Sequence, residues 1–129
     1  MTTATGTFAV QGWDEQTYEE REGGAKLTRA TVTLRFAGAL EGDGAVQWLM
    51  AYRPDGTAAF VGLQRVNGSL GGRDGSFVLA DTGAFEGGVA RGTWTIVSGS
   101  GEGGLAGISG SGGFEAGKDA TYTLDYDLG

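Results

Sequence analysis

In the stretch TRATVTLRFAG, residues 28–38, the side chains from Arg29 to Phe36 alternate strictly between polar and apolar. One face of an extended chain carries the apolar members: Ala30, Val32, Leu34 and Phe36. The other face carries threonine and arginine. A period of two with one apolar face is typical of an antiparallel strand that covers a core on one side only. The same period recurs in AVQWLMAYR (residues 45–53), RGTWTIV (91–97) and ATYTLDYDL (120–128).

Turn-forming residues separate these runs. The dipeptides and tripeptides that tolerate the required backbone angles are Asp43-Gly44, Pro54-Asp55-Gly56, Asn67-Gly68, Asp74-Gly75 and Gly87-Gly88. We therefore expect an all-β fold of about eight antiparallel strands, joined mostly by short hairpins in an up-and-down order. Closing into a barrel would remove the exposed sheet edges, so an eight-stranded barrel is predicted, with a β-sandwich as the alternative. The length, 129 residues, predicts one domain over residues 1–129.

The glycine-rich stretch GSGEGGLAGISGSGGFE, residues 99–115, contains the spacing G-x-G-x-x-G of dinucleotide-binding loops. Such a loop needs a helix directly after it, because the helix N-terminus holds the pyrophosphate. Four further glycines follow here, and each costs a helix roughly 1 kcal/mol. The stretch instead predicts a tight hairpin near Gly101–Gly104 that leads into a sharply curved strand.

The composition limits the chemistry. The net charge is −7 and the nine basic residues are scattered, which excludes nucleic acid and an anionic membrane as expected partners. The absence of cysteine and histidine removes thiolate nucleophiles, imidazole bases and the usual zinc ligands. We expect no metal site and no cofactor. The start of the chain is unlike a signal peptide, so a cytoplasmic protein is expected. The acidic run from Asp14 to Glu22 lacks calcium-loop spacing and predicts an exposed loop, long enough to act as a lid.

Several residues are candidates for a binding site inside the barrel. The large side chains on the inward faces would either line a ligand cavity or fill the core, and core packing is the more common role for such residues. These side chains are Trp48, Met50, Tyr52, Phe60, Trp94, Tyr122 and Tyr126. Gln64 shares a face with Phe60, so its amide is expected to be buried and hydrogen-bonded, either to Tyr52 or another interior group or to a substrate carbonyl. Arg73 would be a solvated turn residue or a ligand for a carboxylate. Asp81, Glu86 and Glu115 are expected on solvated faces at the rim.

The glycine-punctuated segment GSGEGGLAGISG (residues 99–110) resembles a hairpin of allene oxide cyclases and plant dirigent proteins. The whole chain resembles a family of small uncharacterised bacterial proteins with an allene-oxide-cyclase-like barrel. The segments that carry this resemblance include LTRATVTLRFAGALEGDG (27–44), AYRPDGTAAFVGL (51–63) and GGRDGSF (71–77). It implies an eight-stranded antiparallel barrel with an internal cavity, and relatives of that barrel are cofactor-free cyclases that commonly form oligomers.

Two departures from the cyclases matter. They carry a carboxylate deep in the barrel on the first strand, where GTFAVQGW (residues 6–13) offers only Gln11, and the bacterial family usually has Glu in place of Gln64. Three functions stay open. The barrel would be a cyclase or isomerase for an apolar, polyketide- or lipid-like substrate, with Gln64 or Tyr52 polarising a carbonyl. It would otherwise be a non-catalytic carrier of an apolar small molecule, or an interaction protein with a filled interior. A void of a few hundred cubic ångströms would favour the first two.

Overall fold

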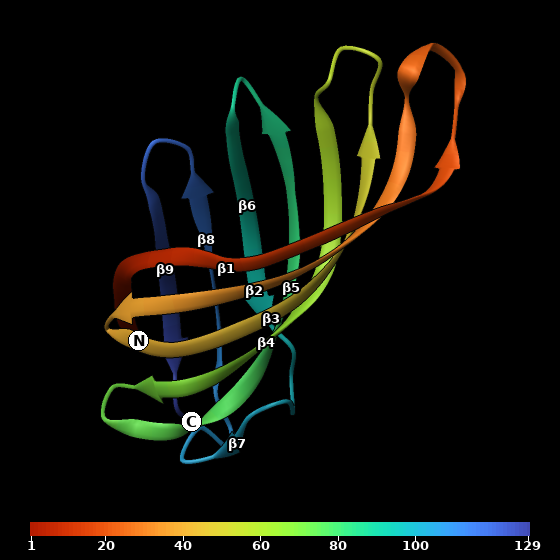
Figure 1. Ribbon diagram of the computed structural model, residues 1–129. Helices are drawn as coiled ribbons and strands as arrows, with labels where there is room; N and C mark the ends of the chain where they lie inside the picture. Colours follow the sequence, from red (N-terminus) through yellow and green to blue (C-terminus); the bar gives the residue numbers. More distant parts are fainter.

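A computed structural model describes residues 1–129 as nine β-strands and one short 3₁₀ turn (Figure 1). The strands are β1 (Thr2–Glu20), β2 (Lys26–Gly38), β3 (Leu40–Tyr52), β4 (Ala58–Leu70), β5 (Arg73–Glu86), β6 (Val89–Ile96), β7 (Glu102–Gly103), β8 (Ser109–Ala116) and β9 (Ala120–Asp127). The 3₁₀ turn η1 (Glu22–Gly24) joins β1 to β2. The molecule contains no helix long and apolar enough to span a bilayer.

Eight of the strands close into an antiparallel barrel. The order around it is β4, β3, β2, β1, β9, β8, β6 and β5, and a β4–β5 pairing completes the ring. Each strand thus pairs with its successor along the chain, apart from the two-residue strand β7, which pairs with Gly75 and Ser76 of β5, before the part of β5 that pairs with β6. The predicted up-and-down barrel is confirmed, and the sandwich is excluded because one continuous sheet closes on itself.

The two ends of the barrel differ. The β1–β2, β3–β4, β5–β6 and β8–β9 connections all lie at one end, which we call the hairpin end, and Figure 1 shows their tips rising above the barrel. The other end, the terminal end, carries the chain termini, the β2–β3 and β4–β5 turns and the connection from β6 to β8. The candidate residues divide between these two ends.

Strand β1 is much longer than its pairing with β9. Only Thr2–Thr7 pair with β9, whereas β1 pairs with β2 from Gly6 to Glu20. From Phe8 onward, one edge of β1 therefore has no neighbouring strand. Register shifts between Val10 and Gly12 and between Thr17 and Glu19 mark two β-bulges on this segment. The prediction of an exposed loop from Asp14 to Glu22 is wrong as far as Glu20, because these residues continue the ladder with β2.

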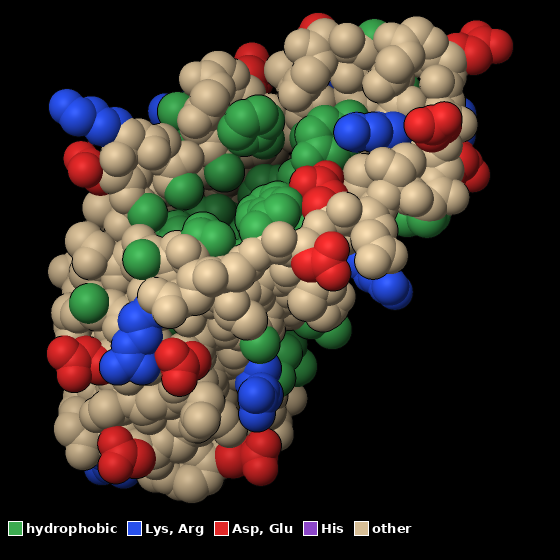
Figure 2. All heavy atoms as spheres, in the orientation of Figure 1, with side chains coloured by type: hydrophobic (Ala, Val, Ile, Leu, Met, Phe, Trp, Pro, Cys, Tyr) green, Lys and Arg blue, Asp and Glu red, His purple; other side chains and the backbone are tan.

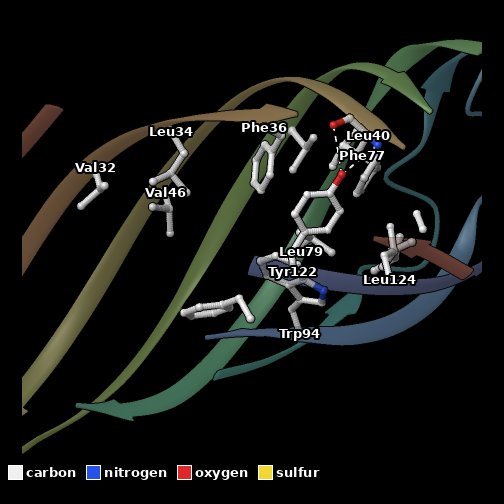
Figure 3. Close-up of a cluster of buried hydrophobic side chains, with 14 of the residues drawn as sticks. Val32, Leu34, Phe36, Leu40, Val46, Phe77, Leu79, Trp94, Tyr122 and Leu124 are labelled. Atoms are coloured by element: carbon white, nitrogen blue, oxygen red, sulfur yellow. Dashed lines mark hydrogen bonds between the residues drawn. The ribbon is translucent and has the colours of Figure 1, made fainter. Parts of the chain in front are cut away.

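The core forms where the alternating apolar faces meet inside the barrel. Phe36 and Tyr122 pack edge to face with ring centroids 5.5 Å apart, and Trp94 lies 6.4 Å from Phe36 (Figure 3). The Tyr122 hydroxyl accepts a hydrogen bond from the Leu40 amide at 2.9 Å. It also lies 3.1 Å from the carbonyl oxygens of Ala37 and Leu40, to which it donates. Tyr122 on β9 is therefore tied to the β2–β3 turn at the terminal end.

Glycines within the strands make room for aromatic rings. A Cβ atom on Gly62 would lie 2.7 Å from Cδ1 of Trp48, and one on Gly44 would lie 2.8 Å from Phe36. The pairs Asp43-Gly44, Asn67-Gly68 and Asp74-Gly75 lie inside β3, β4 and β5, so their prediction as turns is wrong. The turns at Pro54–Gly56 and Gly87-Gly88 are present as predicted.

The glycine-rich stretch forms no tight hairpin near Gly101–Gly104. Residues 97–108 make a longer connection between β6 and β8, and β7 within it pairs with Ser76 and Gly75 of β5. Leu105 and Ile108 of this connection are buried in the core cluster. Their burial gives the connection a packing role at the terminal end, and β8, which follows, does enter the barrel as predicted.

Candidate functional site

A small cavity of about 90 Å³ opens between β1 and the hairpin-end halves of the other strands. Its lining is wholly apolar and consists of Phe8, Val10, Trp13, Leu34, Trp48, Met50, Phe60, Phe85, Ala90, Phe114 and Ala116. Figure 2 shows hydrophobic side chains gathered in a hollow of the molecular surface. We call this space the mouth cavity. Three of the predicted binding residues, Trp48, Met50 and Phe60, line it.

Aromatic rings define the shape of the mouth cavity. The Trp48 ring lies 5.3 Å from Phe60 and is stacked on Phe114 at 6.2 Å. Trp13 from β1 packs over Trp48 at 5.9 Å, yet 49% of Trp13 stays exposed. Val10, the other large exposed residue of the lining, is 52% exposed. The cavity thus has a base of packed aromatic rings and an exposed apolar rim on β1.

A polar network fixes the rim beside the cavity. Glu15 accepts hydrogen bonds from the hydroxyls of Thr28 at 2.6 Å and Tyr52 at 2.7 Å, and from the Trp13 indole at 3.1 Å. Partial burial raises the pKa of Glu15, but these hydrogen bonds and the charge of Lys26 outweigh it and lower the pKa below its ordinary value. Glu15 is therefore an ionised acceptor that orients Trp13.

Tyr52, a predicted catalytic residue, belongs to this network and does not line the mouth cavity. Burial, followed by the hydrogen bond and negative charge of Glu15, raises the pKa of Tyr52 to about 12. The hydroxyl is thus neutral and already donates to Glu15. This arrangement leaves it as an anchor for the rim, with its oxygen 3.8 Å from the Met50 sulfur.

Two polar side chains lie fully buried deeper in the barrel. Gln64 and Asp81 both have an exposed fraction of zero. Asp81 Oδ2 accepts a hydrogen bond from the Trp48 indole at 3.2 Å, whereas Asp81 Oδ1 and both polar atoms of Gln64 have no partner. Burial raises the pKa of Asp81 to about 7 despite the Trp48 hydrogen bond. Asp81 was expected on a solvated face, and that expectation is wrong because β5 extends to Glu86 and turns Asp81 inward.

The remaining predicted residues lie away from the mouth cavity. Trp94 contacts Phe114 at 5.2 Å and donates its indole N–H to the Thr123 carbonyl at 3.1 Å, behind the cavity wall. Tyr122, Tyr126 and Arg73 lie at the terminal end: the two tyrosines pair with Gly6 and Thr2 at the start of β1, and Arg73 is an exposed first residue of β5. Their assignment to substrate binding has no support in the cavity geometry. No group of three or more acidic side chains is placed to hold a metal ion.

The sequence interpretation missed four contributors to the site. Trp13 and Glu15 were assigned to the end of the first strand and to a loop, although their spacing of two, with Thr17 following, continues a strand face. Phe85 and Phe114 were not singled out. Phe114 directly follows two glycines, and a large ring beside glycines is the available signal for a residue that fills space across a strand.

Comparisons with known proteins agree with this architecture. Residues 4–127 match the family model described as Protein of unknown function (DUF3224). The crystal structure of a DUF3224 protein of unknown function from Shewanella oneidensis MR-1 superposes with a TM-score of 0.85 at 32% sequence identity. The alignment covers 98% of this chain and 96% of that one. Among curated proteins, none matches the sequence. The chain therefore belongs to the DUF3224 family, a family of uncharacterised proteins, as the resemblance noted in the sequence had indicated.

Proposed function

We propose that this barrel binds an apolar small molecule in the mouth cavity. The observation that carries the proposal is a cavity with an entirely apolar lining whose rim exposes Trp13 and Val10 to solvent. Exposed large apolar side chains grouped around a concave site favour a binding surface, because a bound apolar molecule removes them from water.

The cavity volume constrains the ligand. About 90 Å³ is smaller than the roughly 300 Å³ or more that encloses a drug-sized molecule. The closed part of the cavity fits a single small ring or the end of an alkyl chain. The rest of a longer molecule would lie against Trp13 and Val10, on the inner face of β1. A slender apolar substrate of polyketide or lipid type matches this shape.

The finer form of the proposal is a cofactor-independent cyclase or isomerase. Such reactions retain every atom of the substrate, so they need no external donor or acceptor. The packed rings of Trp48, Phe60 and Phe114 would restrict a flexible chain to few conformations, which raises the rate of ring closure by proximity. The alternative is a carrier that releases the same molecule unchanged. A structural barrel without a ligand would leave the exposed rim without a role.

Native mass spectrometry of freshly purified protein, followed by organic extraction, tests binding. We expect a stoichiometric apolar adduct, or uptake of methylenecyclohexane as a small apolar probe. Ala116→Phe should abolish uptake, because Ala116 lines the cavity and a phenyl ring would fill it. Ala45→Phe is the matched control, because Ala45 is exposed on the outer face of β3. Equal uptake by both variants, or a bare protein that takes up no probe, would overturn the proposal.

Comparison of the extracted molecule before and after incubation separates catalysis from carriage. The cyclase or isomerase form predicts a product of the same mass with a changed chromatographic position. Recovery of the input molecule alone, at every incubation time, would leave the carrier function in its place.

A further inference from the structure

The interior of the barrel leaves three polar side-chain atoms without a hydrogen bond: Gln64 Oε1, Gln64 Nε2 and Asp81 Oδ1. Other buried polar side chains are paired, including the Thr28 hydroxyl with Glu15 and the Trp94 indole with the Thr123 carbonyl. Burying an unpaired amide or carboxyl costs free energy, and such groups in native proteins are concentrated where a ligand or an internal water completes them. The three free atoms therefore point to an occupant.

The two residues project from adjacent strands. Gln64 of β4 lies opposite Leu79 of β5, and Asp81 is two residues further along β5, so both side chains enter the barrel at diagonal positions. The amide group of Gln64 lies within 3.5 Å of the position that a Cβ on Gly44 would take. The Phe36 ring lies still closer to that position, at 2.8 Å, so the amide of Gln64 lies beside an aromatic ring that offers it no hydrogen-bond partner.

The Trp48 side chain links Asp81 of this pair to the mouth cavity. Trp48, Gly62 and Asp81 lie at one level on β3, β4 and β5. Because Gly62 has no side chain, the Trp48 indole extends across it and donates to Asp81. The same Trp48 ring lines the mouth cavity, as does Phe60, which shares the inward face of β4 with Gln64. Asp81 thus lies behind the Trp48 wall of the cavity, and Gln64 lies two residues along β4 from Gly62, which is paired with Trp48.

We propose that Gln64 and Asp81 form a carbonyl-binding site, reached by displacement of the Trp48 ring, for the oxygen of the apolar molecule bound in the mouth cavity. This inference rests on the proposed function and names its substrate class, an apolar molecule with a carbonyl group near the buried end. Gln64 Nε2 donates one hydrogen bond to the carbonyl oxygen. Asp81 in its neutral form donates a second through Oδ1, and the two donors together would stabilise negative charge that develops on that oxygen.

The surroundings of Asp81 favour its neutral, donating form. Trp48, Gly62 and Trp94 occupy its level on β3, β4 and β6, and none of them carries a charge. Burial is the main cause that raises the pKa of Asp81, to about 7. A carboxylate ligand is disfavoured because no cation faces the pair, whereas a neutral carbonyl oxygen needs only the two donors.

Two probes of equal shape test this inference. Cyclohexanone and methylenecyclohexane differ only in =O against =CH₂, and ligand-observed NMR gives a dissociation constant for each. The preference for the ketone is the dissociation constant of methylenecyclohexane divided by that of cyclohexanone. At pH 6, we expect this ratio to be roughly tenfold higher in the wild type than in Gln64→Met, which is the effect of about one hydrogen bond. Gln47→Met is the matched control, because Gln47 is exposed on the outer face of β3 and should leave the ratio unchanged.

The pH dependence gives a second, independent readout. As the pH rises from 6 to 8.5, ionised Asp81 can no longer donate, so the wild-type preference for the ketone should fall. Asp81→Asn keeps a donor at every pH and should retain the preference across this range. The inference would be overturned if Gln64→Met kept the wild-type ratio and the wild-type preference did not change with pH. Binding of methylenecyclohexane in that case would still support the proposed function. Binding of neither probe would overturn both.

Discussion

The buried carboxyl of Asp81 accepts a hydrogen bond from the Trp48 indole, and this contact connects the interior of the barrel to the wall of the mouth cavity. Its position depends on Gly62, which lets the indole extend across β4. Three strands thus contribute one residue each to an arrangement that no single segment of the sequence reveals. We test the burial of the Asp81 carboxyl and the space that Gly62 leaves for Trp48 with one substitution each.

The first concerns Asp81→Asn. The folded pKa of Asp81, about 7, lies above the unfolded value of about 4, so its contribution to stability is complete below pH 4 and is lost as the pH rises through 7. Relative to the variant, the free energy of unfolding of the wild type should fall by about 2 kcal/mol between pH 5.5 and 8.5, with most of the fall below pH 7. Urea denaturation at pH 5.5, 7 and 8.5 measures this. Asp74→Asn, at an exposed position, should follow the wild type. A parallel pH profile for wild type and Asp81→Asn would contradict the buried, neutral carboxyl.

The second concerns Gly62→Ala. A methyl group here would meet Cδ1 of Trp48 at 2.7 Å and the Gln47 carbonyl oxygen, so the indole or the strand must shift. We expect a loss of about 1–3 kcal/mol in the free energy of unfolding, the usual cost of overpacking. Gly12→Ala is the control, because its added methyl meets only the hydroxyl end of Thr33. Chemical denaturation followed by tryptophan fluorescence compares the two, and equal stabilities would show that Trp48 does not depend on Gly62.

At this scale, the sequence could place Trp48, Met50 and Phe60 at the cavity because each lies on a clean alternating face. It could not place Asp81, since the position of an acid near the expected end of a strand depends on how far the ladder continues. That length is set by the partner strand, and Asp81 lies opposite both Gly62 and Trp94. The free atoms of Gln64 were equally unpredictable, because Tyr52, its expected partner, is bound to Glu15 instead.

At the scale of elements, the β2–β3 turn depends on a residue from the far end of the chain. Tyr122 of β9 provides its hydroxyl to the Leu40 amide and to the carbonyls of Ala37 and Leu40. The turn itself is only one residue long, Ala39, between β2 and β3. A phenolic oxygen therefore completes the backbone hydrogen bonding that this short turn leaves open.

Tyr122→Phe should destabilise the protein by about 1–3 kcal/mol, the cost of leaving a buried amide without an acceptor. Tyr126→Phe is the matched control, since Tyr126 lies on the same face of β9 and its hydroxyl makes no hydrogen bond within the chain. Thermal and urea denaturation of both variants measures the difference. If both variants lost the same free energy of unfolding, the hydrogen bonds between Tyr122 and the β2–β3 turn would not contribute to stability.

The alternation in the sequence predicted the strands well and their ends poorly. Dipeptides such as Asp43-Gly44 and Asn67-Gly68 read as turns because asparagine, aspartate and glycine tolerate turn geometry. In the barrel the same glycines lie where neighbouring backbones or rings approach closely. Tertiary packing therefore outweighs the local preference of these dipeptides for a turn. The bulge between Val10 and Gly12 concealed Trp13 and Glu15 for a related reason, because it changes which of the following residues face inward.

At the scale of the whole molecule, the barrel closes only when the first and last strands pair. Thr2–Thr7 of β1 pair with Thr121–Tyr126 of β9, so the final ladder joins opposite ends of the chain. Contacts between residues so distant in sequence form slowly, because the loop-closure entropy is lost before the contacts compensate for it. The fold is therefore expected to form and to be lost as one unit.

Refolding from urea should be slow for a chain of this size, in the range of milliseconds to seconds. Equilibrium unfolding should give coincident transitions by far-ultraviolet circular dichroism and by tryptophan fluorescence. Deletion of residues 120–129 should abolish both signals of the native state, because it removes β9 from the ring. A truncated chain that kept a native spectrum would contradict cooperative closure.

The unpaired edge of β1 from Phe8 to Glu20 has a further consequence for the protein at high concentration. Open strand edges recruit other chains and lead to fibrous assembly. Here the edge carries two bulges, which break the straight register that an incoming strand needs, and Asp14, Glu19 and Glu20 add negative charge on a chain that is already acidic. A long binding face can therefore stay open to small molecules while the protein resists polymerisation with its own copies.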